Sequence, residues 1–437
     1  MKKMSVFLML LVLTLSMTAN AFAAQKVLSV VHPKYKMAGD FIEEIQRKKR
    51  APEGYIPIST PAEFCKIGLN PAANYILLAD IDLSGREHET ITGFCGILDG
   101  NGYTVSNPAK TLINTVKGGC VMNLGLRAHL RDSNAGLVGY AADGATIFNC
   151  WFDGAIVNNT LLAMGGIAYR LEGSSVVSCH NRASLTAQLP DGAYSTREAV
   201  CGGIVANLED NAIVCNCINQ GSINAGDNIQ REQIAGGIVG MYDISTGDGS
   251  YSRVLHCRND GTIYGKHAAG IVGGVYITRD YATLYTANCF NAGNISAAQY
   301  SGGILNVRII EKGSVVVQDC YNIGPCPGSG IVGGEVQQRS FDRLAADLMN
   351  VRIERCFNYA ASQAGVTGLC KNLDSCYYLD KSPSATLDGA LFTTVRALST
   401  KDMSKQKSFS GFDFGETWQM GKQYPVFRST EYPEYVY

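Results

Sequence analysis

A short phrase of glycines and aliphatic residues recurs along the chain and limits the possible folds more than any other feature. One copy reads QIAGGIVGMYD at residues 233–243, and eight copies in all, this one included, stand 27 to 37 residues apart. Glycine and aliphatic side chains offer no acid, base or nucleophile, so the repetition indicates an architectural role. The glycine before the first aliphatic residue of each copy is Gly136, Gly166, Gly203, Gly237, Gly270, Gly303, Gly330 or Gly365.

A second word lies between the copies of the first and has the skeleton Cys-x-Asn-x-Gly-x-Ile, as in NCFNAGNI at residues 288–295. Phe152 and Tyr378 interrupt the asparagine series, and Cys376 belongs to a degraded copy. The cysteines are Cys150, Cys179, Cys217, Cys257, Cys289, Cys320 and Cys356, and the asparagines are Asn181, Asn219, Asn259, Asn291, Asn322 and Asn358.

The spacers between the two words vary: 11 to 26 residues separate each glycine from the next cysteine, and 9 to 24 separate that cysteine from the next glycine. Constant words with variable spacers indicate a fixed rung with loops of free length. Alternating runs such as ATIFNCWF and SVVVQDCYN are typical of short strands, and they argue against the helical arrays that share this period. The sequence therefore predicts an all-β fold, a parallel β-solenoid of about eight coils over residues 116–380.

In a solenoid each residue lies about 4.8 Å from its equivalent in the next coil, so the repeated positions should form ladders. We expect the glycines at tight turns and the first aliphatic residue of each phrase, such as Ile238, inside the core. The asparagines suit a left-handed bend and an amide ladder, and a row of ligand-binding amides is the alternative. The cysteines of the second word should be buried thiols, since stacked side chains fit a disulfide poorly, and disulfide pairing is the alternative.

Both ends of such a stack expose unpaired edges and need covering. We expect an N-terminal capping module at residues 55–115, where Thr60, Pro61 and Glu63 predict a capping box and a short helix. A closing module is expected at residues 381–437, with a helix in STKDMSKQKSF followed by an aromatic-rich segment. Residues 24–54 are expected to be a linker or short helix, with a processing site or a basic docking tail as alternatives.

The N-terminal residues 1–23 combine two lysines, an apolar core and an A-x-A-like end, which predicts a secretory signal peptide cleaved after Ala23. An uncleaved anchor is the alternative. The chain has 37 basic and 38 acidic residues, a formal net charge of −1, so a nucleic-acid partner is not expected. We expect no membrane span after the signal peptide and a secreted or loosely surface-associated protein.

These words resemble the GLUG-repeat family of bacterial secreted and surface proteins over roughly residues 55–430. YILLADIDLSG with FCGILDGNGYTVSN is similar to the family's opening module, and GFDFGETWQMGKQYPVF to its closing module. The resemblance implies a β-helical extracellular region of the kind found in adhesins and beside the protease domain of IgA-specific metalloendopeptidases. The chain departs from the family where REHETIT follows the DIDLSG word.

Residues that could carry chemistry are few. EHET lacks the second histidine of a zinc protease, and Asp80, Asp82 and Asp99 suit turns better than a calcium loop. No catalytic, metal-binding or cofactor-binding residue is therefore predicted, and no cofactor. Parallel β-helices can carry polysaccharide lyases or glycosidases, which need acids gathered on one face. The candidates for that alternative are Asp243 and Asp248; Arg279 and Asp280; Arg308, Glu311 and Lys312; Arg339, Asp342 and Arg343.

The favoured function is a noncatalytic extracellular module that binds a polymer or a surface ligand, either a glycan or a host protein. Specificity is expected in the variable loops at 241–256, 274–288 and 334–355, because these can change without disturbing the rungs. Acids from three consecutive coils converging in one cleft would favour the enzyme, whereas scattered acids would favour binding. The oligomeric state is left open.

Overall fold

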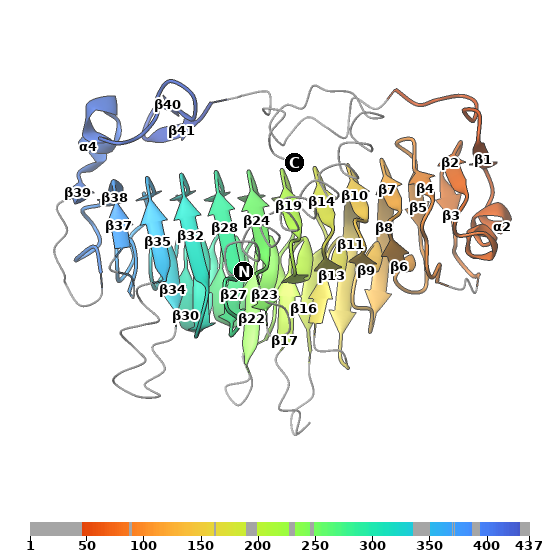
Figure 1. Ribbon diagram of the computed structural model, residues 1–437, viewed down its shortest axis with the longest axis horizontal. Coiled ribbons are helices and arrows are strands. Elements are labelled where there is room, and N and C mark those ends of the chain that lie inside the picture. The colour runs from red at the N-terminus through yellow and green to blue at the C-terminus, as the bar shows by residue number, and fades with distance from the viewer. Residues whose placement is uncertain are drawn as a thin grey trace, which may run out of the picture.

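The chain winds into a parallel β-solenoid, with one layer of strands stacked on the next along a single axis (Figure 1). The fold comes from a computed structural model that describes residues 46–86, 90–160, 163–188, 199–226, 232–244, 249–334, 350–368, 370, 372–386 and 394–428. This confirms the all-β solenoid that the repeated words predict. The expected signal peptide at residues 1–23 lies outside the described residues.

Three sheets form the walls, and all of their strand pairings are parallel. Sheet A has twelve strands: β1 (Tyr55–Ile58), β2 (Asn74–Leu77), β4 (Ile97–Asp99), β7 (Cys120–Met122), β10 (Thr146–Phe148), β14 (Ser175–Val177), β19 (Ile213–Cys215), β24 (Tyr251–Leu255), β28 (Thr283–Ala287), β32 (Ser314–Gln318), β35 (Val351–Glu354) and β37 (Asn372–Asp374). Sheet C has eight: β6 (Ile113–Lys117), β9 (Val138–Ala142), β13 (Ala168–Glu172), β18 (Val205–Glu209), β23 (Val239–Ile244), β27 (Val272–Ile277), β31 (Leu305–Ile310) and β34 (Val332–Gly334).

Sheet B takes one or more strands from each coil, the first bearing the ladder asparagine and the last leading into the glycine phrase. Its strands are β3 (Ile81–Asp82), β5 (Thr104–Ser106), β8 (Gly125–Arg131), β11 (Trp151–Asn158), β12 (Ala163–Gly165), β15 (His180–Asn181), β16 (Ser184–Ala187), β17 (Ala199–Gly202), β20 (Ile218–Asn219), β21 (Ile223–Asn224), β22 (Gln233–Gly236), β25 (Arg258–Asn259), β26 (Ile263–Ala269), β29 (Phe290–Asn291), β30 (Ile295–Gly302), β33 (Tyr321–Asn322), β36 (Phe357–Asn358), β38 (Cys376–Leu379) and β39 (Val395–Leu398).

The stack is longer than the eight coils that the repeated words predict. Strands β1, β2 and β4 pair in series and join β7, so sheet A already begins at Tyr55. The repeated words do not reveal the extra coils, because those coils have other residues at the repeated positions. Leu124, for example, occupies the position that is equivalent to Cys150 in the next coil. A single hydrophobic core nevertheless runs from Ile58 to Cys376.

The phrase glycines are required by close contact with the next coil. A Cβ on Gly203 would lie 2.1 Å from the carbonyl oxygen of Gly237 and 2.7 Å from Oδ1 of Asn219. The other phrase glycines from Gly166 to Gly330 meet the same two obstacles, and none of them has a positive φ. The expected reason, a tight turn that needs glycine's backbone freedom, is therefore wrong; the ladder amide occupies the space of the missing side chain.

In four copies of the phrase the residue just before the phrase glycine is also glycine, and a different contact explains it: Gly165, Gly202, Gly236 and Gly302. Between β17 and β18 the chain turns so sharply that a Cβ on Gly202 would lie 1.8 Å from the carbonyl oxygen of Val205. Gly236 and Gly302 face the same obstruction in later coils. Two successive steric constraints thus explain the repeated pair of glycines.

The left-handed bend falls on the residue before each ladder cysteine, and the ladder asparagine lies three residues further along the chain. From Asn149 to Ser375 these preceding residues have φ values between 48° and 55°. Non-glycine residues adopt this conformation at a cost, and Asn and Asp adopt it most readily. The positions are Asn149, Ser178, Asn216, His256, Asn288, Asp319, Arg355 and Ser375.

Short helices and aromatic residues close the two ends, as the sequence predicts. At the N-terminal end, Thr60 caps helix α2 (Pro61–Phe64) in a capping box with Glu63, and Phe64 and Ile67 are buried. Ile67 begins the 3-10 helix η1 (Ile67–Leu69). Before the first strand, Lys48 contacts Asp99 at 3.0 Å, so the described part of the 24–54 segment docks on an early coil.

The closing module folds back over one side of the solenoid. It contains helix α4 (Thr400–Met403), the 3-10 helix η2 (Gln406–Ser408) and an antiparallel pair, β40 (Trp418–Met420) and β41 (Pro425–Phe427), which Figure 1 shows above the last coils. Trp418 packs on a stacked outer row that includes Tyr321 and Phe357. The closing module therefore buries aromatic residues that face away from the core.

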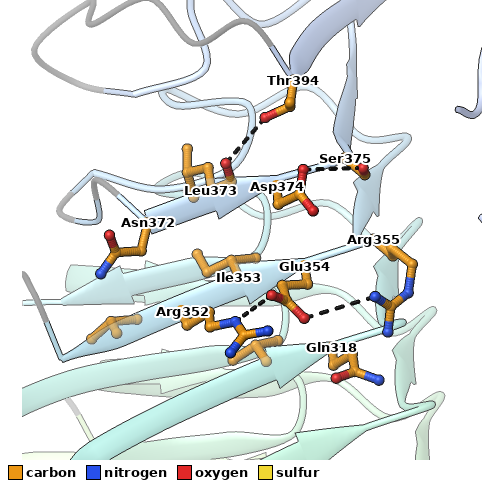
Figure 2. A network of polar contacts seen from close by, with 12 residues as sticks. Gln318, Arg352, Ile353, Glu354, Arg355, Asn372, Leu373, Asp374, Ser375 and Thr394 are labelled. Atoms are coloured by element: carbon orange, nitrogen blue, oxygen red, sulfur yellow. Dashed lines mark hydrogen bonds and ion pairs between the residues drawn. The ribbon is translucent and has the colours of Figure 1, made fainter. Parts of the chain in front are cut away.

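Charged side chains form a network of hydrogen bonds and ion pairs on the outer face of sheet A near this end (Figure 2). Glu354 accepts a hydrogen bond from Arg352 and lies 3.7 Å from Arg355. Arg355 also donates two hydrogen bonds of 2.8 Å to Asp319 in the preceding coil. The indole N–H of Trp418 donates to the same aspartate at 3.2 Å, which fastens the closing module to the solenoid.

Candidate functional site

The repeated residues line the interior of the solenoid and form its scaffold. Five ladder cysteines accept a hydrogen bond from the backbone N–H of the preceding ladder cysteine, with N to Sγ distances of 3.3 to 3.5 Å: Cys179, Cys217, Cys289, Cys320 and Cys356. All eight ladder cysteines are buried and none is in a disulfide. The six ladder asparagines are fully buried and donate to one another at 2.7 to 2.9 Å. No ladder amide faces solvent.

Among the catalytic candidates that the structure describes, four lie in two neighbouring turns, and Asp243 and Arg308 lie in strands. Lys312 pairs with Asp280 at 3.0 Å, in neighbouring turns between sheets C and A. Arg279 and Glu311 lie in the same two turns, and Arg308 lies in β31. Asp248, Arg339, Asp342 and Arg343 lie outside the described residues.

Three acids from consecutive coils do meet on the outer face of sheet C. Leu171 and Leu208 belong to the core, so their neighbours Glu172 and Glu209 project outward from β13 and β18. Asp243 of β23 follows Tyr242, which is in register with Leu208, so it stands beside Glu209. We call Glu172, Glu209 and Asp243 the carboxylate row.

One arginine and one tyrosine organise this row. Arg170 contacts Glu172 at 3.2 Å and Glu209 at 2.6 Å. The hydroxyl of Tyr140, in the coil before, donates to Glu172, and the guanidinium lies 5.2 Å from the Tyr140 ring centre. The side chains of Arg170, Glu172 and Glu209 are 42%, 36% and 17% exposed, so a partner can reach the row from outside.

Burial changes the acid–base properties of two of these groups. Burial raises the pKa of Glu209 to about 7; the charges of Asp243 and Glu172 add to the rise, and Arg170 opposes it. Burial and the hydrogen bond with Glu172 raise the pKa of Tyr140 to about 12. Glu209 is therefore near its midpoint at neutral pH and can give or accept a proton, whereas Tyr140 remains a neutral phenol.

The sequence contained a signal for this row that the expectations missed. An acid follows the phrase glycine by six residues in three consecutive repeats, at Glu172, Glu209 and Asp243. Only Asp243 is among the predicted candidates, because those candidates come from the longest spacers, whereas Glu172 and Glu209 follow their phrase glycines within shorter ones. A comparison of equivalent positions across the repeats would have found the other two.

A second polar cluster lies where sheets B and C meet. Glu232 contacts Lys266 at 2.6 Å, His267 at 2.5 Å and Arg308 at 3.0 Å, and the His267 ring stacks on Tyr300. Burial acts to raise the pKa of Glu232, but the hydrogen bond from Lys266 and the charges of His267 and Arg308 outweigh it and leave that pKa lowered. This carboxylate therefore links three consecutive coils.

Within the described ranges, no three His, Cys, Asp or Glu side chains lie close enough to hold a metal ion. Nor does the described part of the chain contain a helix long and apolar enough to cross a membrane.

Comparisons with known proteins give little further guidance. No family model matches the chain, and no curated protein matches it. Among solved structures, it is similar to a putative immunoglobulin A1 protease from Bacteroides ovatus, with 16% sequence identity, a TM-score of 0.37, and coverage of 91% of this chain and 99% of that one. A likeness at this TM-score carries no argument about activity.

Proposed function

We propose that this chain is exported after cleavage near Ala23 and acts outside the cell as a noncatalytic GLUG-repeat module that binds an extended polymer or surface ligand. The apolar N-terminus supports export, and the ordered glycine and cysteine words support the family. The interior ladders support a rigid rod, because every coil is hydrogen-bonded to the next.

The observation that carries this proposal is the polar row on sheet C. Tyr140, Arg170, Glu172 and Glu209 come from three consecutive coils and are already hydrogen-bonded to one another while still partly exposed. Preordered polar groups lose little conformational freedom on binding. Groups repeated along an axis suit an extended partner, because weak contacts at successive coils reinforce one another.

Three consecutive coils do supply neighbouring acids, which meets part of the expectation for an enzyme, but Arg170 favours binding over catalysis. It contacts both Glu172 and Glu209, so each carboxylate already has a cationic partner. A catalytic pair would need one carboxylate held apart as the nucleophile or base.

The test measures retention of the mature chain on immobilised glycans and host surface proteins. We expect the wild type to be retained, and Arg170→Ala to weaken retention at least several-fold while the melting temperature shows a folded protein. Arg127→Ala, an exposed arginine on sheet B, is the matched control and should bind as the wild type does. Binding by Arg170→Ala equal to that of the wild type would show that the polar row on sheet C is not the binding surface. A wild type that no surface retains would contradict the binding function itself.

The second candidate function is polysaccharide cleavage, and one observation favours it. A carboxyl with a pKa of about 7 beside a second carboxyl is suited to proton transfer to a leaving group. Under this alternative Glu209 is the general acid and Asp243 or Glu172 the partner. Release of reducing or unsaturated sugar ends by the wild type, lost in Glu209→Gln, would establish it.

A further inference from the structure

An exposed tyrosine occupies a turn where neighbouring coils have glycine. Tyr281 has a φ of 61° and 84% of its surface is exposed, in the turn that leads into β28. The corresponding turns before β24 and β32 place Gly249 and Gly313 in the left-handed region. A bulky side chain is disfavoured in that conformation, and its exposed ring gains no packing in return. An unfavourable residue of this kind, kept at an exposed site, points to a role outside folding.

Two more tyrosines stand beside this turn on the outer face of sheet A. Tyr251 of β24 is in register with Thr283, two residues after Tyr281. Its ring stacks on Tyr285 of β28 with 6.4 Å between centroids and 23° between planes. Tyr251 is 38% exposed, so the pair presents ring surface to solvent. Burial raises the pKa of Tyr285 to about 12, and this phenol therefore stays uncharged at neutral pH.

A guanidinium lies near these rings. Arg253 is two residues after Tyr251 on the same face and is in register with Tyr285. Its guanidinium carbon is 5.9 Å from the Tyr251 ring centre. None of the ion pairs among the described residues includes Arg253, and its buried Nε has no hydrogen-bond partner.

Another arginine in the same row of sheet A, Arg352, has a carboxylate partner. Arg352 follows Tyr285 and Val316 in register and is hydrogen-bonded to Glu354 within its own strand (Figure 2). An arginine normally satisfies its planar donors in such a pair. Arg253 neighbours the rings of Tyr251 and Tyr285, and within the described ranges it has no carboxylate partner. Its guanidinium can therefore pair with an anion of a bound ligand.

We propose that Tyr251, Arg253, Tyr281 and Tyr285 form a binding platform for a carboxylated polysaccharide, such as a polyuronate. The tyrosine rings contact the C–H faces of successive sugars, and the Arg253 guanidinium pairs with a sugar carboxylate. The inference rests on the proposed binding function and assigns it a ligand class and a second surface. The four residues fall within 241–256 and 274–288, two of the segments expected to be loops that set specificity. The expectation of loops is wrong for much of both segments, because strands β23, β24, β27 and β28 occupy them.

Single-stranded nucleic acid is the other anionic polymer that stacks on aromatic rings. It needs a positively charged groove that follows the phosphates over several nucleotides. The platform supplies one unpaired guanidinium, and the chain has a formal net charge of −1. A polyuronate also carries a charge on every unit, but its sugars can pack their C–H faces on the tyrosine rings with one carboxylate paired to Arg253. Single-stranded nucleic acid depends on the charged groove, so we favour the polyuronate.

The experiment titrates the mature chain with polygalacturonate, neutral amylose and single-stranded oligothymidylate. We expect binding to polygalacturonate that falls about tenfold in Arg253→Ala, which corresponds to the loss of one charge-assisted pair. Tyr281→Gly should also weaken binding several-fold while keeping or raising the melting temperature, because glycine relieves the backbone conformation. Arg352→Ala is the matched control in the same row and should bind as the wild type does.

The outcomes separate this inference from the proposed function. Equal polygalacturonate binding by wild type, Arg253→Ala and Tyr281→Gly would overturn the platform and leave the binding function standing. Preference for amylose or for oligothymidylate would overturn the carboxylated-glycan assignment. Absence of binding to polygalacturonate by the folded wild type, with retention on another surface ligand, would likewise overturn the platform alone.

Discussion

The side-chain amide of Asn219 donates a hydrogen bond of 2.8 Å to the side-chain oxygen of Asn259 in the next coil. Asn259 repeats the contact with Asn291 at 2.7 Å and also donates to the carbonyl oxygen of Gly261. Each interior asparagine of the ladder therefore accepts a hydrogen bond from the asparagine of the preceding coil and donates one to the asparagine of the next coil. A polar group is tolerated in this core because its partner is supplied by the equivalent residue of the next coil.

Asn259→Ala should destabilise the fold by about 2–5 kcal/mol, because it leaves buried polar groups of two neighbours without a partner. Asn181→Ala is the matched control: Asn181 begins the ladder and contacts only one other ladder amide, Asn219. Urea denaturation should show the smaller loss for Asn181→Ala. An equal loss for the two variants would mean that the ladder does not act as a chain of coupled contacts.

Ile238 is completely buried, and Ile238→Asp should cost several kcal/mol, about 3–5, by placing an unpaired charge in the core. The damage should reach both neighbouring coils, since each coil is packed on the next. Ser296→Asp, on the exposed face of β30, tests whether a new acid alone is responsible. A melting temperature that barely moved in Ile238→Asp would contradict the inward orientation.

The cysteines give a prediction that needs no mutation. Cys65 and Cys95 are exposed and the other thirteen are buried, with none of the fifteen in a disulfide. Burial raises the pKa of Cys376 to about 12, which keeps that thiol protonated and unreactive. A thiol reagent should therefore detect about two groups in buffer and all fifteen in nonreducing denaturant. Fewer than four in denaturant would show that the ladder is disulfide-bonded.

Glu209 makes stability depend on pH in a defined direction. Its folded pKa of about 7 lies above the ordinary value of about 4.3, so the fold favours the protonated form. That stabilisation is complete below about pH 4 and is lost as the pH rises through 7. Glu209→Gln, which resembles the protonated acid, should match the wild type near pH 4 and exceed it by on the order of 2 kcal/mol near pH 8.

Thermal or urea unfolding at the two pH values checks this prediction, with the exposed Glu416→Gln as control. A wild type that gains stability relative to Glu209→Gln as the pH rises would show that Arg170 outweighs the effect of burial.

The repeated words were enough to predict the parallel solenoid and its closed ends, because stacking requires the same residue at the same place in every coil. They did not reveal why each residue is needed. The phrase glycines are needed because a side chain there would collide with a ladder amide, as at Gly203 and Asn219. The left-handed bend falls one residue before each ladder cysteine. Both facts depend on contacts between coils, which spacing along one chain does not show.

The candidate surfaces were harder to predict because they are exceptions to the repeat. Glu172 and Glu209 lie in regular strands, where a search of the long loops does not look. Tyr281 stands out only when its turn is compared with those at Gly249 and Gly313. In a repeat protein the scaffold follows from what recurs, and the functional surface from the positions where one coil departs from its neighbours.

In the proposed function the chain binds a polymer and does not cleave it. One sample tests it directly: the purified mature chain is incubated with a polysaccharide panel and with IgA, with and without added calcium or zinc, and both retention and products are followed. We expect retention on at least one polymer with no new sugar ends and no cleaved IgA. Release of reducing or unsaturated ends that Glu209→Gln abolishes would contradict it and establish the carboxylate row as an active site.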